Sequence, residues 1–190
     1  MRMSHGVCNG TNVLSIQLNV ANLAGELGDN LASFSFLKTI DLSNNHIGGT
    51  IPSNLPVTLQ NIFLSDNDIT GSIPSSLSSL SQLSAMPING NQLTGEIPDS
   101  FQGLTALVNF DLSSNSFSGA LPSLIGNLSS LTTLHLQNNQ LSGTLDVLQD
   151  LPLADLNVEN NLFNGPISQK LFSVPTFKNY RFGIRTSQVA

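Results

Sequence analysis

One apolar frame recurs along most of this 190-residue chain and constrains its fold more than any other feature. A copy such as Leu37 to Pro52 carries apolar residues at its first, fourth and sixth positions, then an asparagine, an apolar residue, a glycine and finally Ile-Pro. The sixth position recurs at spacings of 24, 22, 24, 24, 24 and 22 residues, at Leu18, Leu42, Leu64, Ile88, Leu112, Leu136 and Val158. Seven copies in one frame predict a repeat architecture.

Each slot of the frame has a physical reading. Alternation of apolar and polar residues before the asparagine predicts a short strand with one buried face, and stacked copies place such strands in a parallel sheet. The asparagine amide is expected to satisfy backbone groups of neighbouring turns that would otherwise be buried without a partner. The asparagines are Asn45, Asn67, Asn91, Asn115, Asn139 and Asn161, whereas the first copy has Ala21 in this slot.

The frame resembles the leucine-rich-repeat pattern, and its Gly-x-Ile-Pro extension resembles the plant-specific class of that repeat. The resemblance implies an α/β leucine-rich-repeat solenoid of about seven repeats. A right-handed coil would carry a parallel β-sheet on its concave face and irregular or 3-10 structure on its convex side. We expect a remnant of an N-terminal cap at 1–12, the solenoid at 13–170, and a C-terminal cap remnant with a mobile tail at 171–190.

Two turns are two residues shorter than the others, and two prolines are informative. Pro56 lies in the short back segment 53–58, which favours irregular structure over a helix there. Pro87 lies inside an expected strand, where it removes a backbone donor. We therefore predict a local defect in the sheet at the fourth turn.

Composition excludes several classes of function. Only 9% of residues are charged and the net charge is −6, so the chain has no general attraction for nucleic acid. The single cysteine, Cys8, excludes an intrachain disulfide and a zinc site built from several thiolates. The histidines have no metal-ligand spacing, and we expect no metal, no cofactor and no membrane span in this sequence.

The concave strands expose the residues between their apolar positions, and these offer a candidate ligand-binding surface. In the middle column of that face, Phe63 is flanked by Asp41 and Pro87. An aromatic beside an acid is a plausible anchor for a partner protein or peptide. The alternative is an isolated surface aromatic that neighbouring side chains cover.

Asp111 and His135 occupy the same column on consecutive strands, with Ser113 one step along. A serine, histidine and aspartate together require a catalytic triad to be weighed. An open sheet supplies neither a dry pocket nor oxyanion donors, so we favour a cross-strand polar pair and expect no enzyme activity. Asp41, Phe63, Asp111 and His135 are the candidate ligand-binding residues.

Two Asn-x-Ser/Thr sequences are candidate glycosylation sites, at Asn9 and Asn127. Such matches occur by chance in a sequence rich in asparagine and serine. Asn127 is the better candidate, because it falls on the expected convex side just before a repeat begins.

Three segments narrow the resemblance to the STRUBBELIG receptor family: Gly25-Glu26-Leu27, the short turn with Leu55-Pro56, and the stretch from Leu145 to Leu153. Membership implies a plasma-membrane receptor-like kinase that acts in cell-to-cell signalling, with a protein or peptide ligand and a co-receptor on the extracellular side. The cap of that family has a further cysteine and a tryptophan upstream of Gly6, which this chain lacks, as it lacks the signal peptide, span and kinase domain. The expectation is thus a truncated, non-catalytic receptor ectodomain.

The alternative is a free secreted leucine-rich-repeat protein that resembles a polygalacturonase inhibitor. Such inhibitors are expected to carry closed cysteine pairs at both ends. This sequence has only Cys8, which favours the receptor.

Overall fold

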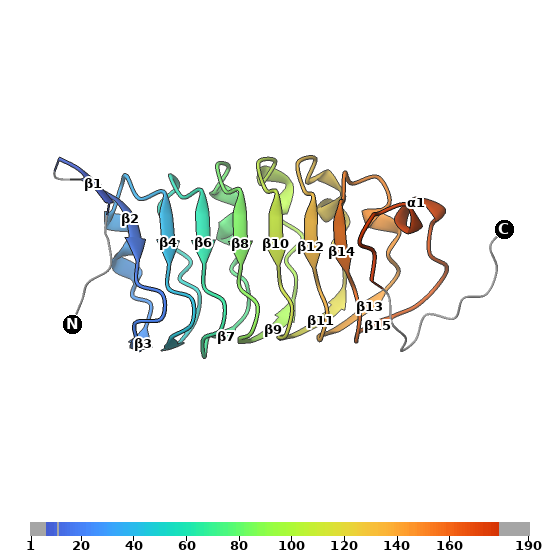
Figure 1. The fold of residues 1–190 in the computed structure, drawn as a ribbon, viewed down its shortest axis with the longest axis horizontal. Helices are drawn as coiled ribbons and strands as arrows, with labels where there is room; N and C mark the ends of the chain where they lie inside the picture. The colour runs from blue at the N-terminus through green and yellow to red at the C-terminus, as the bar shows by residue number, and fades with distance from the viewer. Residues whose placement is uncertain (1–6, 11, 179–190) are drawn as a thin grey trace.

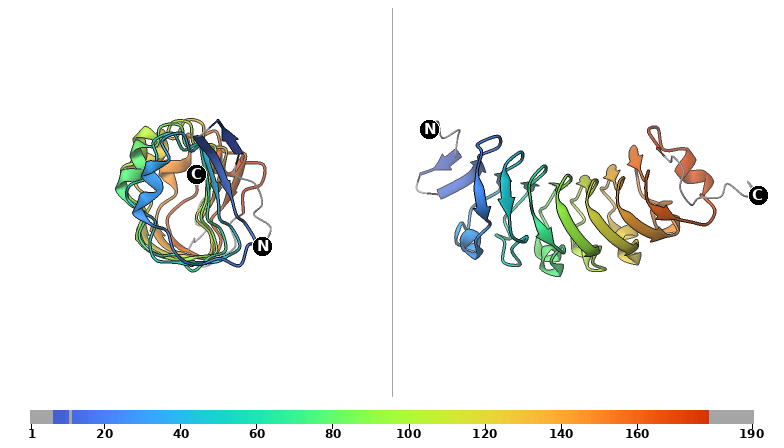
Figure 2. Two further views of the ribbon diagram at one scale, coloured as in Figure 1. Left: turned by 90° about the vertical axis from the view of Figure 1, so that its left-hand side faces the viewer. Right: turned by 90° about the horizontal axis from the view of Figure 1, so that it is seen from below.

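The computed structural model describes residues 7–10 and 12–178. The expected mobile tail therefore lies almost wholly outside the described residues. Within them the chain winds into a stack of turns, with one end of the stack near β1 and the other near α1 (Figure 1). Seen along the stack, the turns superpose on one outline (Figure 2).

One strand from each turn contributes to an eight-stranded sheet, which confirms the solenoid with its stacked parallel strands. From β2 onward the neighbours are parallel and pair in register, as Thr39, Ile40 and Asp41 do with Asn61, Ile62 and Phe63. Strand β1 precedes them and pairs antiparallel with β2. In sheet order the strands are β1 (Val7–Asn9), β2 (Asn12–Gln17), β4 (Thr39–Asp41), β6 (Asn61–Phe63), β8 (Ala85–Pro87), β10 (Asn109–Asp111), β12 (Thr133–His135) and β14 (Asp155–Asn157).

A second set of strands runs along one edge of the solenoid, and the sequence had not led us to expect it. It forms where each turn leaves its asparagine and approaches its glycine (Figure 1). Five of these strands make one parallel sheet: β7 (Thr70–Gly71), β9 (Gln92–Glu96), β11 (Ser116–Ala120), β13 (Gln140–Gly143) and β15 (Leu162–Phe163). The remaining two, β3 (Ala24–Glu26) and β5 (His46–Gly48), pair with each other.

Short 3-10 helices cover the side opposite the eight-stranded sheet, as the repeat class implies. Proline occupies the N-cap of two of them, where its extended backbone leads directly into the helix. The helices are η1 (Asp29–Ser33), η2 (Ser75–Ser79), η3 (Phe101–Gly103), η4 (Ser123–Asn127) and η5 (Asp146–Leu148). The segment 53–58 around Pro56 has none, as predicted.

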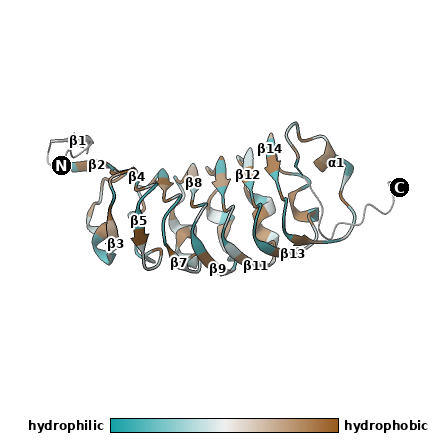
Figure 3. Ribbon diagram, turned by 60° about the horizontal axis from the view of Figure 1, so that its bottom comes forward, coloured by the Kyte–Doolittle hydropathy of each residue, from teal (hydrophilic) through white to brown (hydrophobic). Residues whose placement is uncertain are grey.

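The core is a single column of apolar, mainly aliphatic side chains inside the coil, and the phenylalanines Phe101, Phe110, Phe117 and Phe163 are among its largest members. Hydrophobic and hydrophilic segments alternate within each turn, because each strand buries one face and exposes the other (Figure 3). The first turn is less buried than the rest: Val13, Ile16 and Leu18 are only partly buried. It covers the end of the core, as a terminal repeat must.

At the other end, α1 (Gln169–Phe172) closes the stack. Leu171 is buried in the core, and Phe177 packs against the core while contacting Phe172 edge to face. Lys178 then adds a single parallel bridge to β14 opposite Asn157. The sheet edge is therefore partly covered by the segment that follows α1.

Each repeated asparagine joins two turns. Asn67 accepts the backbone N–H of Ile47 at 3.0 Å and donates to the carbonyl of Leu42 at 3.0 Å, both in the preceding turn. It also donates to the carbonyls of Leu64 and Ser65 in its own turn. The same arrangement repeats at Asn45, Asn91, Asn115, Asn139 and Asn161.

The predicted sheet defect is present at Pro87. Strand β6 pairs with β8 only at Asn61 and Ala85, whereas β4 and β6 pair at three positions. The cause is the missing N–H of proline. Pairing resumes one step further on, because Leu64 N donates to the carbonyl of Pro87 at 3.0 Å.

Over residues 7–10 and 12–178, no helix has the length and apolar character that crossing a membrane requires.

Candidate ligand-binding face

The face of the eight-stranded sheet that points away from the core carries the candidate site residues. In most strands the central residue is buried and its two neighbours are half-buried, as with Thr39, Ile40 and Asp41. Four of the half-buried neighbours are the predicted residues Asp41 on β4, Phe63 on β6, Asp111 on β10 and His135 on β12. They share one register column but form two groups, separated by Pro87.

Phe63 is half-buried rather than freely exposed. Its register partner on β4 is Asp41. The carboxylate of Asp41 is occupied locally, because Oδ1 accepts both the N–H of Ser43 at 3.1 Å and its hydroxyl at 2.8 Å. This turn ends the strand, so Asp41 has a structural role in addition to any role at a binding surface.

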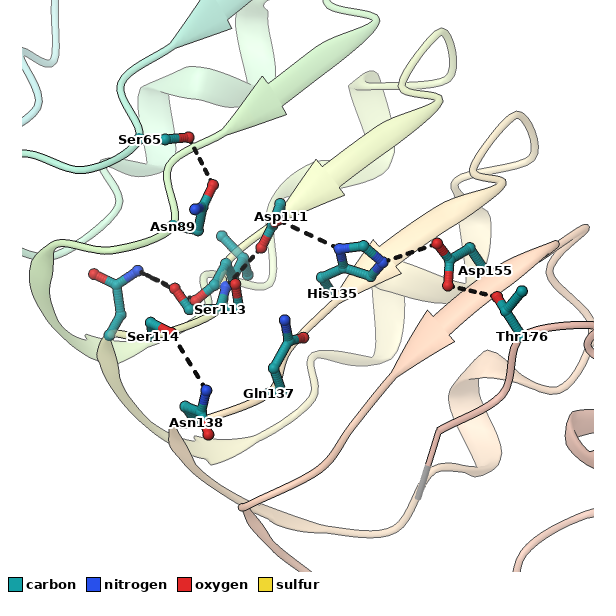
Figure 4. A network of polar contacts seen from close by, with 12 residues as sticks. Ser65, Asn89, Asp111, Ser113, Ser114, His135, Gln137, Asn138, Asp155 and Thr176 are labelled. Atoms are coloured by element: carbon teal, nitrogen blue, oxygen red, sulfur yellow. Dashed lines mark hydrogen bonds and ion pairs between the residues drawn. The ribbon is translucent and has the colours of Figure 1, made fainter. Parts of the chain in front are cut away.

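His135 lies between two carboxylates. Its Nδ1 is 3.3 Å from Asp111 Oδ2 on β10, and its Nε2 is 3.1 Å from Asp155 Oδ2 on β14 (Figure 4). The contact with Asp111 confirms the predicted cross-strand pair. We refer to Asp111, His135 and Asp155 as the histidine cluster.

Each carboxylate of the histidine cluster has a further donor. Asp111 Oδ1 accepts the backbone N–H of Ser113 at 2.9 Å. Asp155 Oδ1 accepts the hydroxyl of Thr176, which lies beyond α1 (Figure 4). The cluster therefore connects three strands of the sheet to the C-terminal segment.

The pKa values follow from these contacts. Burial raises the pKa of Asp111, but hydrogen bonds from His135 and Ser113 outweigh it, and the net shift is downward. The hydrogen bond to Asp111 raises the pKa of His135, burial opposes this, and Asp155 reinforces it. The pKa of Asp155 is lowered mainly by Thr176, with His135 and Lys178 adding to the effect.

This geometry argues against a triad. Both ring nitrogens of His135 face carboxylates, so neither contacts the hydroxyl of Ser113, whose side chain bonds to Asp111 instead. A serine nucleophile needs a histidine nitrogen within hydrogen-bond reach. Across residues 7–10 and 12–178, no three His, Cys, Asp or Glu side chains are grouped so that they could hold a metal ion.

Two members of the network were missed from the sequence. Asp155 lies diagonally opposite His135, since the register partner of His135 is Asn157. A search along straight columns therefore does not pair them, although diagonal neighbours lie within reach of long side chains. Thr176 falls outside the repeat frame, which gives no signal for its position.

The two candidate glycosylation sites differ in what the structure describes. Asn127 ends η4 on the helical side of the coil, and its side chain is exposed. Asn9 belongs to β1, but its side chain lies outside the described part of the structure.

We compared the sequence with protein-family models and the fold with solved structures. Leucine-rich-repeat family models match residues 57–117 and, for a second model, 36–57 and 130–151. The chain is therefore a leucine-rich-repeat protein. Its fold is similar to the ectodomain of the receptor kinase GASSHO1/SCHENGEN3 from Arabidopsis thaliana, with a TM-score of 0.83 and 32% identity, over 90% of this chain and 21% of that one. It is also similar to the peptide hormone receptor RGFR1, with a TM-score of 0.81 and 28% identity, over 92% of this chain and 28% of that one.

The particular family follows from sequence identity. The chain is 70% identical over 171 residues to Protein STRUBBELIG-RECEPTOR FAMILY 3 of Arabidopsis thaliana, and 66% identical over 171 residues to STRUBBELIG-RECEPTOR FAMILY 1 of the same plant. Each match covers 90% of this chain and 22% of the relative. The chain belongs to the leucine-rich-repeat receptors of the STRUBBELIG family, and it spans about a fifth of the length of these relatives.

Proposed function

We propose that this chain is a non-catalytic, ligand-binding region of a plant receptor, and that its eight-stranded sheet contacts a peptide or protein ligand. The observation that supports the proposal most is the similarity to receptor ectodomains that carry peptides. The GASSHO1/SCHENGEN3 ectodomain is in complex with CASPARIAN STRIP INTEGRITY FACTOR 2, and RGFR1 is in complex with RGF2. Family likeness further supports an extracellular position in a membrane receptor. We also propose a co-receptor as a second partner.

Phe63 and the histidine cluster are the proposed contacts. Both lie on the outward face of the sheet, and that face has few other charged or aromatic side chains to orient a ligand. Aromatic anchors contribute strongly to binding when a partner covers them. Asp41 is the fourth proposed contact, beside Phe63.

The test uses a displayed library of random peptides, selected on the 190-residue chain. Phe63→Ala and Asp111→Ala are then compared with Gln102→Ala, which changes an exposed side chain of η3 on the opposite side. We expect the selected peptides to bind Phe63→Ala or Asp111→Ala at least about tenfold more weakly than the wild type, equivalent to about 1.4 kcal/mol. Their affinity for Gln102→Ala should equal that for the wild type. If Gln102→Ala weakens peptide binding, or if neither Phe63→Ala nor Asp111→Ala does, the binding surface lies elsewhere.

A secreted inhibitor remains the alternative from the sequence, and no feature of the described fold favours it over a receptor. Asn127 is a proposed glycosylation site under either function, because an exposed position on the helical side leaves the sheet face free.

A further inference from the structure

His135 has a hydrogen-bonding arrangement that only one of its protonation states can fulfil. The imidazolium donates from both nitrogens, whereas neutral imidazole donates from one nitrogen and accepts at the other. Both nitrogens here face carboxylate oxygens, at 3.3 and 3.1 Å. A carboxylate offers no hydrogen to an unprotonated ring nitrogen, so contacts with carboxylates at both nitrogens are favourable only for protonated His135.

We propose that His135 is a pH-sensitive clasp on the ligand-binding face: protonated, it holds β10, β12 and β14 together through Asp111 and Asp155, and on deprotonation it releases Asp155. This inference deepens the proposed function and rests on it for the role of the face. The clasp itself is a property of the free chain.

The two carboxylates are not equivalent, and this decides which one is released. The side chain of Asp111 is 19% exposed and that of Asp155 is 39% exposed, so Asp111 has less access to water as a substitute donor. Asp155 keeps Thr176 as a donor and has Lys178 nearby when His135 withdraws. Neutral His135 should therefore retain its proton on Nδ1, facing Asp111, and present the Nε2 lone pair toward Asp155.

The groups that face the clasp are few. Within the described chain, Asp111 from β10 and Asp155 from β14 are the charged groups that act on His135, and Lys178 acts on Asp155 from the C-terminal segment. The hydrogen bonds to both carboxylates raise the pKa of His135, with burial opposing them. The clasp is thus closed at mildly acidic pH and opens as pH rises through this raised value.

Opening changes what the face offers to a ligand. Closed, the histidine cluster has two carboxylates and one cation, with every charged group paired. Open, it has lost the cation and gained a carboxylate oxygen on Asp155 that is available to solvent or to a ligand donor. Ligand affinity at this face would then depend on pH without any change in the backbone.

The first test is nuclear magnetic resonance on the full chain, following ring nitrogen and carbon shifts of the histidines against pH. His46→Gln and His135→Gln variants assign the signals to the individual histidines. We expect His135 to titrate above the ordinary histidine value of about 6.5 and to become the Nδ1–H tautomer. Titration of His135 at or below that ordinary value, or a neutral Nε2–H tautomer, would overturn the proposal.

The second test measures the free energy of unfolding in urea at pH 5.5 and pH 8.5. Wild type and His46→Gln should lose more stability between these values than His135→Gln, which has no clasp to open. Equal losses in all three proteins would show that His135 is not the titrating group. Neither experiment uses a ligand, so the clasp and the proposed function can fail independently.

Discussion

Glu96 on β9 lies against Gly119 on β11, one turn further along the edge sheet. A Cβ built on Gly119 would come within 2.8 Å of Glu96 Cγ, and the glycine has a φ of +79°. Both facts make an ordinary side chain at this position unfavourable. The glycine of the repeat therefore adopts the positive φ that the bend requires, and its missing side chain leaves space for the side chain of the neighbouring turn.

Gly119→Ala should destabilise the chain by about 1–3 kcal/mol, the usual cost of a strained backbone position. Gly95→Ala is the matched control, because Gly95 has a similar φ of +81° but its nearest neighbour is Ser72 Cβ at 3.5 Å. Urea denaturation should show the larger loss for Gly119→Ala, and Glu96→Ala should recover part of it. Equal losses for both alanine variants would assign the whole effect to the backbone.

Asn91→Ala tests the asparagine contacts. The side chain accepts the N–H of Ile69 and donates to the carbonyls of Leu64, Ile88 and Asn89. Its removal leaves the buried N–H of Ile69 without an acceptor, whereas the three carbonyls keep other donors, from Asn67, Asn115 and Asp66 respectively. At about 1–3 kcal/mol for one unsatisfied buried group, we expect a loss of at least about 1 kcal/mol in the free energy of unfolding. The exposed Gln102→Ala should change it by less than about 0.5 kcal/mol. Similar values for the two variants would contradict the structural role of the asparagine.

Phe110→Ala tests the aromatic part of the core. Phe110 is fully buried and meets Phe101 edge to face, with ring centroids 5.6 Å apart. Truncation should cost about 3–5 kcal/mol, measured as a shift of the denaturation midpoint. Val108→Ala, two residues earlier and exposed, should leave the midpoint nearly unchanged. A small loss at Phe110 would mean that neighbouring turns collapse into the space.

The decline in the free energy of unfolding at low pH should depend on Asp111. The folded state lowers the pKa of this carboxyl. The stability that it contributes is therefore complete above its unfolded value of about 3.9 and is lost as pH falls through the lower folded value. Asp111→Asn should flatten the decline in urea stability below about pH 4, whereas Gln102→Ala, an exposed uncharged residue on the opposite side, should not. If Asp111→Asn loses as much stability at low pH as the wild type, other carboxyl groups cause the loss.

Glycosylation at Asn127 is testable by secretion from a eukaryotic host. Asn127→Gln and Ser129→Ala should each remove the same enzymatically cleavable glycan, seen as a mass difference. Asn9→Gln reports separately on the second sequence. An identical mass for wild type and both first variants would show that Asn127 is not modified.

Most of the fold follows from the repeat frame, because each repeated apolar, asparagine or glycine position has one structural role. The sheet, the asparagine contacts, the defect at Pro87 and the pair of Asp111 with His135 were all predictable. The edge sheet was not, since its strands are short segments such as Thr70–Gly71 without an alternating apolar pattern. Asp155 contacts His135 from a diagonal position on the next strand, which a comparison of register columns does not reveal. Thr176 bonds to Asp155 from a segment outside the repeat frame, so the repeat spacing does not predict its position.

The asparagine contacts also run in one direction along the chain. Each asparagine receives an N–H from the turn before it, so Ile47 depends on Asn67 and Ile69 on Asn91. During synthesis, a turn can complete its buried hydrogen bonds only after the next one has left the ribosome. A nascent chain halted before Asn91 therefore leaves the N–H of Ile69 without its acceptor, and the last turn formed is always the one with an incomplete set of buried hydrogen bonds.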